Sequence, residues 1–144
     1  MQELIAKVKP LSCVTPTAGV AGTSAITGST IDTLGFNGVL FLVQFGTITA
    51  GAVTSFKVEH SDNSDMSSNA DIVGTSQTVA DTDDNKVFFC DLRKPVKRYV
   101  RLLVSRGTQN AAVSAVALPY DPSDAPFTQT ASGESHVSPI SGTA

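Results

Sequence analysis

Residues 83–106 read DDNKVFFCDLRKPVKRYVRLLVSR, and this stretch decides the fold class. Two apolar runs, 87–92 and 99–104, flank a basic corner that has Pro95 at its middle. Proline has no N–H to donate to a sheet ladder, and it pushes the preceding residue away from helical geometry. The pattern therefore predicts a strand, a tight charged corner and a second strand, arranged as a hairpin.

The strongest strand pattern in the chain is VLFLVQF at residues 39–45. Its odd-numbered positions are all Val or Phe, and its even-numbered positions are Leu, Leu and Gln. Successive side chains of a strand point to opposite faces, so both faces of this strand are largely apolar. We expect a central strand that is covered on both sides or lies at a subunit contact.

The rest of the chain repeats this pattern of short strands and turns. Val, Thr, Ser, Ala and Gly are abundant, whereas the strong helix formers Leu, Glu and Lys are sparse. Further strands are expected at 26–34 (kinked at Gly28), 52–60, 71–74, 75–80 and 111–118, with a solvent loop at 61–70. About seven or eight short strands with frequent turn signals predict an all-β fold, a single antiparallel β-sandwich of jelly-roll or immunoglobulin-like type.

Proline and small residues set the expected domain boundaries. Residues 1–20 contain two prolines and are predicted to form an N-terminal arm, with the sandwich at 21–120. Pro119 and Pro122 are expected to end the sheet. Residues 121–144 are rich in Ser, Thr, Pro and Gly, so they are predicted to form an extended tail that cannot bury a core of its own.

Charge and cysteine content exclude several classes of protein. Charged residues make up 16% of the chain and the net charge is −3, which argues against a nucleic-acid-binding domain. No apolar run approaches the length of a membrane span, and the first residues lack the pattern of a signal peptide. We therefore expect a soluble protein made in the cytoplasm, with Cys13 and Cys90 as buried free thiols rather than a disulfide.

No arrangement of residues points to catalysis, so the chain is predicted not to be an enzyme and to need no cofactor. The two histidines, His60 and His136, are far apart, and no GxSxG motif is present. The acidic segments 62–65 and 81–85 offer oxygen ligands of the kind that calcium prefers. They lack the glycine and glutamate of an EF-hand loop, so solvated turns are the simpler interpretation and calcium stays an alternative.

Two groups of residues are candidates for contact with a partner. The first is the basic corner, made of Arg93, Lys94, Lys97 and Arg98. It is interpreted either as solvated charge that protects a sheet edge, or as a docking patch for an acidic partner or for the DTDDN segment (81–85) of a neighbouring copy. The second group is formed by the isolated apolar residues of the tail, Phe127, Val137 and Ile140.

Three segments carry a resemblance to a known family. They are HSDNSDMSSNADIVG (60–74), ADTDDNKVFFCDLRKPVKRYVRLLVSR (80–106) and AVSAVALPYDPSDAPF (112–127). Together they resemble a family of small virion proteins of tailed bacteriophages, which are usually encoded beside the major capsid protein. In that family a strand of the type VEHSD precedes an acidic loop, followed by a hairpin of the type DDNKV…RKPxKRYVR and a closing strand.

The resemblance implies a head decoration or cement protein with a β-sandwich core. Such a protein binds the lattice of the major capsid protein on the virion surface, together with other copies of itself, and stabilises the head. It implies no nucleic acid, membrane or small-molecule partner. Two alternatives stay open: a carbohydrate- or receptor-binding module on the virion, although the chain has no Trp and only two Tyr, and a structural component of the neck or tail.

Overall fold

The computed structural model describes residues 4–123 and 126–133, which form a β-sandwich. The first, four-stranded sheet has the order β1 (Leu11–Val14), β10 (Ala111–Pro122), β4 (Phe36–Ile48), β8 (Val87–Arg93). The second sheet has the order β2 (Ile26–Thr27), β9 (Tyr99–Ser105), β5 (Thr54–Ser61), β6 (Ala70–Asp71), with β3 (Ile31–Asp32) also on β9 and β7 (Gln77–Val79) also on β5. All strand pairs are antiparallel.

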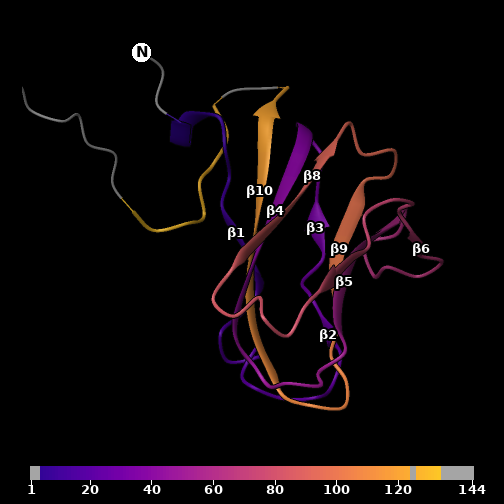
Figure 1. Ribbon diagram of the computed structural model, residues 1–144. Coiled ribbons are helices and arrows are strands. Elements are labelled where there is room, and N and C mark those ends of the chain that lie inside the picture. The colour runs from indigo at the N-terminus through magenta and orange to yellow at the C-terminus, as the bar shows by residue number, and fades with distance from the viewer. Residues whose placement is uncertain (1–3, 124–125, 134–144) are drawn as a thin grey trace, which may run out of the picture.

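The two sheets enclose one hydrophobic core, as Figure 1 shows from the side of the sandwich. The odd-numbered residues of 39–45 are all fully buried, which confirms the strand faces expected from the sequence. Phe45 of β4 packs against Phe56 of β5 and edge-on against Phe88 of β8, with ring centroids 6.3 and 5.7 Å apart. The prediction of an all-β sandwich is confirmed, while its jelly-roll or immunoglobulin-like subtype stays a prediction.

The hairpin prediction for residues 87–104 is wrong. β8 pairs with β4 in the first sheet, whereas β9 pairs with β5, β2 and β3 in the second. The corner between them therefore crosses from one sheet to the other, and Lys94 takes a positive φ of 50° there. Alternate residues of both strands face inward. With β8 in one sheet and β9 in the other, both strands bury these residues in the same core, from opposite sides.

The predicted N-terminal arm is shorter than expected. Residues 11–14 form β1 at the edge of the first sheet, and both Cys13 and Val14 are buried in the core. Val8 makes an isolated bridge to Tyr120, so the segment before β1 also lies along β10. The boundary at residue 20 is therefore wrong, because Cys13 and Val14 precede it and belong to the hydrophobic core.

The prediction that Pro119 ends the sheet is also wrong, because β10 continues to Pro122. The carbonyl of Pro119 accepts a hydrogen bond from the Lys9 amide at 2.8 Å, on the side of β10 away from β4. Hydrogen bonds alternate between the two sides of an antiparallel strand, so the missing N–H of this proline removes no bond to β4. The strand can therefore run through the proline.

The predicted solvent loop at 61–70 contains two buried residues, Ser61 and Met66, and Met66 has a positive φ of 60°. Apart from η1 (Leu4–Ala6), one turn of 3-10 helix, the described residues contain strands, turns and irregular segments. None of the helical structure in the described residues is long and apolar enough to cross a membrane.

Candidate functional site

The outer face of the four-stranded sheet carries exposed apolar residues in neighbouring rows. Leu42 of β4 lies opposite Val116 of β10 on one side and opposite Phe89 of β8 on the other. Leu40 lies opposite Leu118 in the next row. We call these residues, together with Val87 at the end of β8, the outer apolar face: Leu40, Leu42, Val87, Phe89, Val116 and Leu118.

Much of the outer apolar face is open to solvent. Phe89 is 65% exposed, Val87 59% and Val116 42%, whereas the inward-facing residues of β4 are fully buried. Part of the surface of any soluble protein is apolar, but large side chains clustered on one sheet face are typical of a contact site. The described residues thus leave much of the second face of β4 uncovered, which fits the expectation of a subunit contact.

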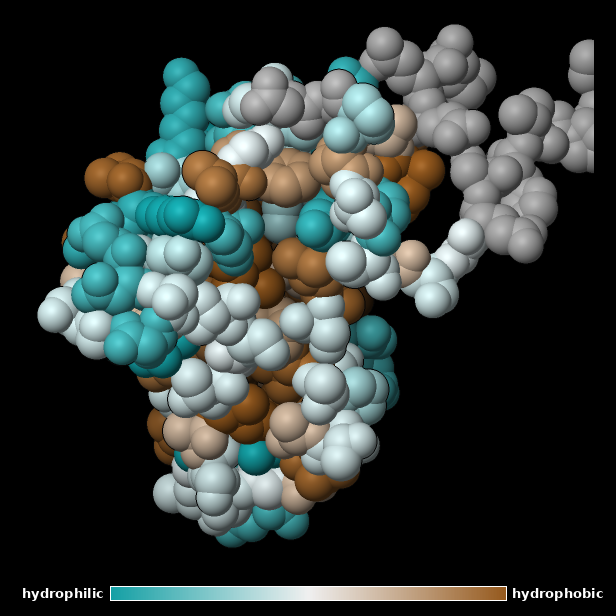
Figure 2. Space-filling model, turned by 180° about the vertical axis from the view of Figure 1, so that it is seen from behind, coloured by the Kyte–Doolittle hydropathy of each residue, from teal (hydrophilic) through white to brown (hydrophobic). Residues whose placement is uncertain are grey.

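The surface elsewhere has a different character. Figure 2, which shows the molecule from behind, has a band of apolar groups along its middle, between pale regions rich in small polar residues. The strongly hydrophilic groups gather on the side that carries the loop before β6. The strongly hydrophilic residues are therefore spread unevenly over the face that Figure 2 shows.

A groove continues the outer apolar face towards the chain termini. It has a volume of about 1100 Å³ and is lined by Leu40, Leu118 and Tyr120 of the sheet and by Leu4, Ile5 and Val8 of the N-terminal segment. Gln129 holds the two terminal segments together, because its side-chain amide donates to the carbonyls of Ile5 and Val8 at 2.7 and 2.6 Å. The groove is thus built by residues far apart in the sequence.

Tyr120 forms one wall of this groove and is fixed by its neighbours. Its ring covers Gly38, the residue opposite it on β4, and its hydroxyl donates to Asp91 Oδ1 at 2.7 Å. Burial, with a smaller effect of the Asp91 hydrogen bond, raises the pKa of Tyr120 to about 12. The phenol is therefore neutral at physiological pH and acts as a hydrogen-bond donor.

Two of the four residues of the basic corner are bound within the chain. Arg98 Nε donates to Asp32 Oδ1 at 2.9 Å and Nη2 donates to Oδ2 at 2.8 Å, and its guanidinium lies 5.0 Å from the centre of the Tyr99 ring. The hydrogen bond from Arg98 holds the pKa of Asp32 below its usual range. Lys97 Nζ lies 3.3 Å from Asp62.

The other two residues of the basic corner are less engaged. Arg93 lies 4.0 Å from Asp91 and its side chain is 82% exposed. Lys94 donates its backbone N–H to Asn37 at 2.7 Å, and no ion pair of its side chain occurs among the described residues. The structure therefore divides the predicted patch into an internally paired half and a half available to a partner.

The acidic segment 81–85 organises its own turn. Asp81 accepts the Gly51 amide at 2.6 Å and Asp84 accepts the Ile48 amide at 2.7 Å. Asp83 accepts from Lys86 Nζ at 2.6 Å, and this hydrogen bond keeps the pKa of Asp83 below its usual range. Among the described residues no three His, Cys, Asp or Glu side chains are grouped to hold a metal ion. These contacts match the interpretation of the segment as a structured turn.

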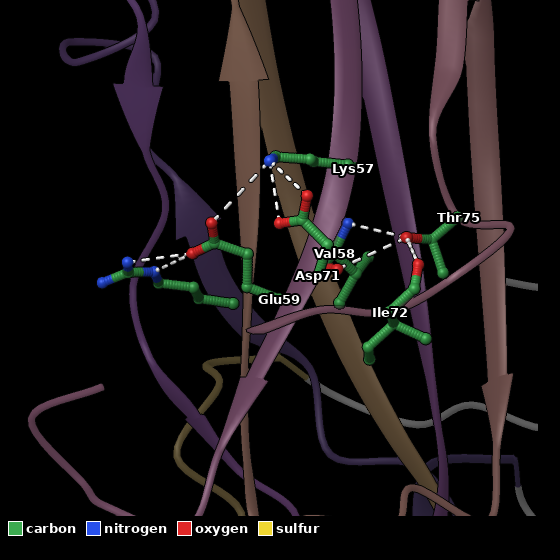
Figure 3. Close-up of polar contacts among 7 residues, drawn as sticks. Lys57, Val58, Glu59, Asp71, Ile72 and Thr75 are labelled. Carbon is green, nitrogen blue, oxygen red and sulfur yellow. Dashed lines mark hydrogen bonds and ion pairs between the residues drawn. The ribbon is translucent and has the colours of Figure 1, made fainter. Parts of the chain in front are cut away.

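A polar cluster on β5, shown in Figure 3, is not among the sites predicted from the sequence. Lys57 Nζ donates to both oxygens of Asp71 at 2.8 Å, and Arg101 Nε donates to Glu59 at 2.9 Å. The Thr75 hydroxyl, at 3.1 Å from the Val58 amide, joins the 72–75 turn to the same strand. The opposite charges of Lys57 and Glu59 on one face of β5 could have indicated such a cluster. Their partners Asp71 and Arg101 lie on other strands, which only the structure places beside β5.

The remaining candidates lie apart from each other. Phe127 is half-buried and packs edge-on against Phe36 of the same chain, with ring centroids 5.2 Å apart. Val137 and Ile140, like His136, lie outside the described residues. His60 lies on β5, opposite Ala70 and Val100.

The two cysteines are free and buried, as the sequence predicts. Desolvation by burial raises the pKa of Cys13 to about 11 and raises that of Cys90 as well. A neutral, buried thiol is a poor nucleophile. Both residues therefore serve the core rather than a reactive site.

The fold and the site define the chain as an antiparallel β-sandwich with an exposed apolar sheet face. No protein-family model and no curated protein matches the sequence. Among solved structures, the PBSX exported protein XepA is similar, with a TM-score of 0.54 and 14% identity. The match covers 96% of this chain but only 46% of XepA, so the chain spans about half the length of that protein.

The SPBc2 prophage-derived protein YomS also matches, with a TM-score of 0.48 and 13% identity over 82% of this chain and 98% of YomS. At such identities, the similarity to XepA shows that the fold is shared.

Proposed function

We propose that this chain is a structural protein of a bacteriophage particle that binds the lattice of the major capsid protein and reinforces the head. The observation that carries the proposal is the outer apolar face, because clustered Leu, Val and Phe side chains on an open sheet face favour burial against another protein. In this role the chain is a binding protein of the virion surface, not an enzyme.

Two further observations support the proposal. The sandwich fold is shared with XepA, a protein of the PBSX prophage. The resemblance of residues 60–74, 80–106 and 112–127 to small virion proteins points to the same setting. A repeating shell also favours such a protein, because many weak contacts on a lattice add up to firm attachment.

The test compares variants of the outer apolar face in binding to purified capsids. Replacing Leu42 and Val116 together by Glu places two charges in the contact, and we expect at least a tenfold loss of affinity, about 1.4 kcal/mol or more. Val73→Glu is the matched control, because Val73 is 98% exposed and lies on a turn of the other sheet. Binding is measured by co-sedimentation with capsids.

Capsids with and without the protein are then heated, and loss of the packaged genome is followed by dye binding. We expect complete particles to withstand a higher temperature. Equal heat resistance would refute the reinforcing role, and unchanged binding of the double Glu variant would refute the proposed contact face.

A further inference from the structure

β8 differs from every other edge strand in the described part of the chain. β1 has four residues and a register shift between Ser12 and Val14, and the edge strands of the second sheet have two or three residues each. β8 has seven residues in unbroken register with β4. Short strands and bulges protect sheet edges from pairing with other chains, and β8 lacks both.

β8 is the last strand of the first sheet (Figure 1), and its hydrogen bonds identify the backbone groups that point to its free edge. The Lys86 carbonyl accepts from Phe45 at 3.1 Å, and the Lys94 amide donates to Asn37 at 2.7 Å. Because bonding alternates along an antiparallel strand, the even-numbered residues bond to β4. The N–H and C=O groups of Val87, Phe89, Asp91 and Arg93 therefore point away from the sheet.

The free edge of β8 is almost unoccupied within the described residues. Its one hydrogen bond from a side chain is donated by Gln77 Nε2 to the Phe89 carbonyl at 2.9 Å. A pairing strand would have to displace only this exposed contact. The apolar side chains of Val87 and Phe89 stand beside the open groups on the outer apolar face.

We propose that β8 pairs with β8 of a second copy of this chain, antiparallel and across a two-fold axis. The charges at the two ends of β8 identify this occupant. The acidic segment 81–85 precedes the strand, whereas basic Arg93 is its last residue and Lys94 follows it. Seven residues of strand separate the two ends by about 23 Å, too far for them to neutralise each other within one chain.

In an antiparallel pair with two-fold symmetry, the acidic end of each β8 lies next to the basic end of the other, so the contact occurs twice. The acidic segment of each copy lies beside Arg93 and Lys94 of the other, where its carboxylates complement the less engaged half of the basic corner. The pair also joins the two four-stranded sheets edge to edge, with both outer apolar faces on the same side. The inference does not depend on the proposed capsid role, since it concerns the purified chain.

The charges also select the register. Only registers that place odd-numbered residues opposite each other use the free groups of both edges. A pair centred on Cys90 sets Lys86 against the partner's Lys94, and a pair centred on Asp91 sets two aspartates against each other. Like charges directly opposite are unfavourable, which favours a pair centred on Phe89 over these two registers. A pair centred on Phe89 also brings the two phenyl rings next to each other.

The first test is sedimentation equilibrium of the full chain over a range of protein and salt concentrations. We expect a monomer–dimer equilibrium that weakens as salt is raised. The Arg93→Glu, Lys94→Glu double variant should raise the dissociation constant at least tenfold. The control is the double variant Lys7→Glu, Lys9→Glu. It changes the net charge by the same amount, but near the opposite edge of the sheet, and should leave the dissociation constant unchanged. A chain that is monomeric at every concentration overturns the proposal.

The second test is disulfide trapping. In a bonded antiparallel pair, opposite Cα atoms are about 5.5 Å apart, within the range for a disulfide. Phe89→Cys should therefore form a covalent dimer under mild oxidation, whereas Val116→Cys, on a central strand of the same face, should not. Trapping through Val116→Cys but not Phe89→Cys would overturn the edge pairing in favour of contact between faces.

Amide hydrogen exchange of the unmodified chain checks the same pairing without a substitution. Protection of the Phe89 and Asp91 amides should rise with protein concentration, while that of the amides bonded to β4 should not change. Unchanged exchange at Phe89 in a dimeric sample would overturn the proposal.

Discussion

Gly38 and Tyr120 show how a single residue shapes the outer face of the first sheet. They lie opposite each other on β4 and β10, and a Cβ atom at position 38 would overlap the tyrosine ring. We expect Gly38→Ala to destabilise the fold by about 1–3 kcal/mol, the usual cost of overpacking. The ring would have to leave both the glycine and its hydrogen bond to Asp91.

Urea unfolding measures this cost, and a second background tests its cause. In a Tyr120→Ala protein the ring is absent, so Gly38→Ala should cost much less there. An equal loss of stability in both backgrounds would show that the backbone of β4, and not the Tyr120 ring, requires glycine at position 38.

The Asp32–Arg98 pair predicts a pH dependence of stability. Arg98 lowers the pKa of Asp32 in the folded protein, so the pair stabilises the fold above the ordinary pKa of the carboxyl group. That stabilisation is lost as the pH falls through the lowered folded-state value. Both side chains are partly exposed, so we expect a contribution below about 1 kcal/mol.

Thermal unfolding of Asp32→Asn checks this prediction, because Asn still accepts a hydrogen bond from the Leu34 amide. The wild type should melt higher than the variant above about pH 5. The difference should begin to shrink near the ordinary carboxyl pKa, at about pH 4, and should vanish only below the lowered pKa of the folded protein. A difference that persists unchanged at low pH would exclude the ion pair as its source.

At the scale of elements, β1 changes the expected outcome of truncation. The sequence predicts that residues 1–20 can be removed without loss of the sandwich, but their removal takes Cys13 and Val14 out of the core. We expect deletion of residues 1–20 to cost about 3–6 kcal/mol, at about 1.5–3 kcal/mol for each of the two buried side chains.

Deletion of residues 1–7 is the matched control, since it leaves β1 in place together with Lys9, whose amide donates to the Pro119 carbonyl of β10. Chemical unfolding should show only a small loss for this shorter deletion. Equal stability of both truncated chains would mean that β1 is dispensable and that residues 1–20 behave as an arm.

The basic corner illustrates why element types were predictable and their partners were not. Alternating apolar residues and Pro95 predicted two strands and a corner, and both strands are present. The partner of each strand depends on which sheet buries the apolar side chains of that strand best. That choice depends on the packing of the whole core and not on the local sequence. The corner therefore joins the two sheets, and Arg98 meets Asp32, a residue 66 positions away.

For the whole molecule, the outer apolar face and the β8 edge adjoin one another through Phe89 and Val87. A dimer joined at β8 would present two copies of this face as one continuous surface. Such a surface suits a lattice of identical subunits, because two linked contact faces bind more tightly than one even though each contact is unchanged. The two proposals are thus compatible, and their tests can fail separately.

The sequence by itself determined the fold class, the faces of the central strand and the buried state of the cysteines. These follow from local rules: strand periodicity, the missing N–H of proline and the cost of burying charge. It also pointed to a subunit contact at residues 39–45, because apolar residues occupy both faces there.

Only the tertiary structure decided that β8 and β9 belong to different sheets, that residues 11–14 complete the core, and which basic residues are already paired. Each depends on contacts between segments far apart in the chain. The sequence carries the apolar and charged groups, but the free energy of burying them depends on the neighbours that folding brings together.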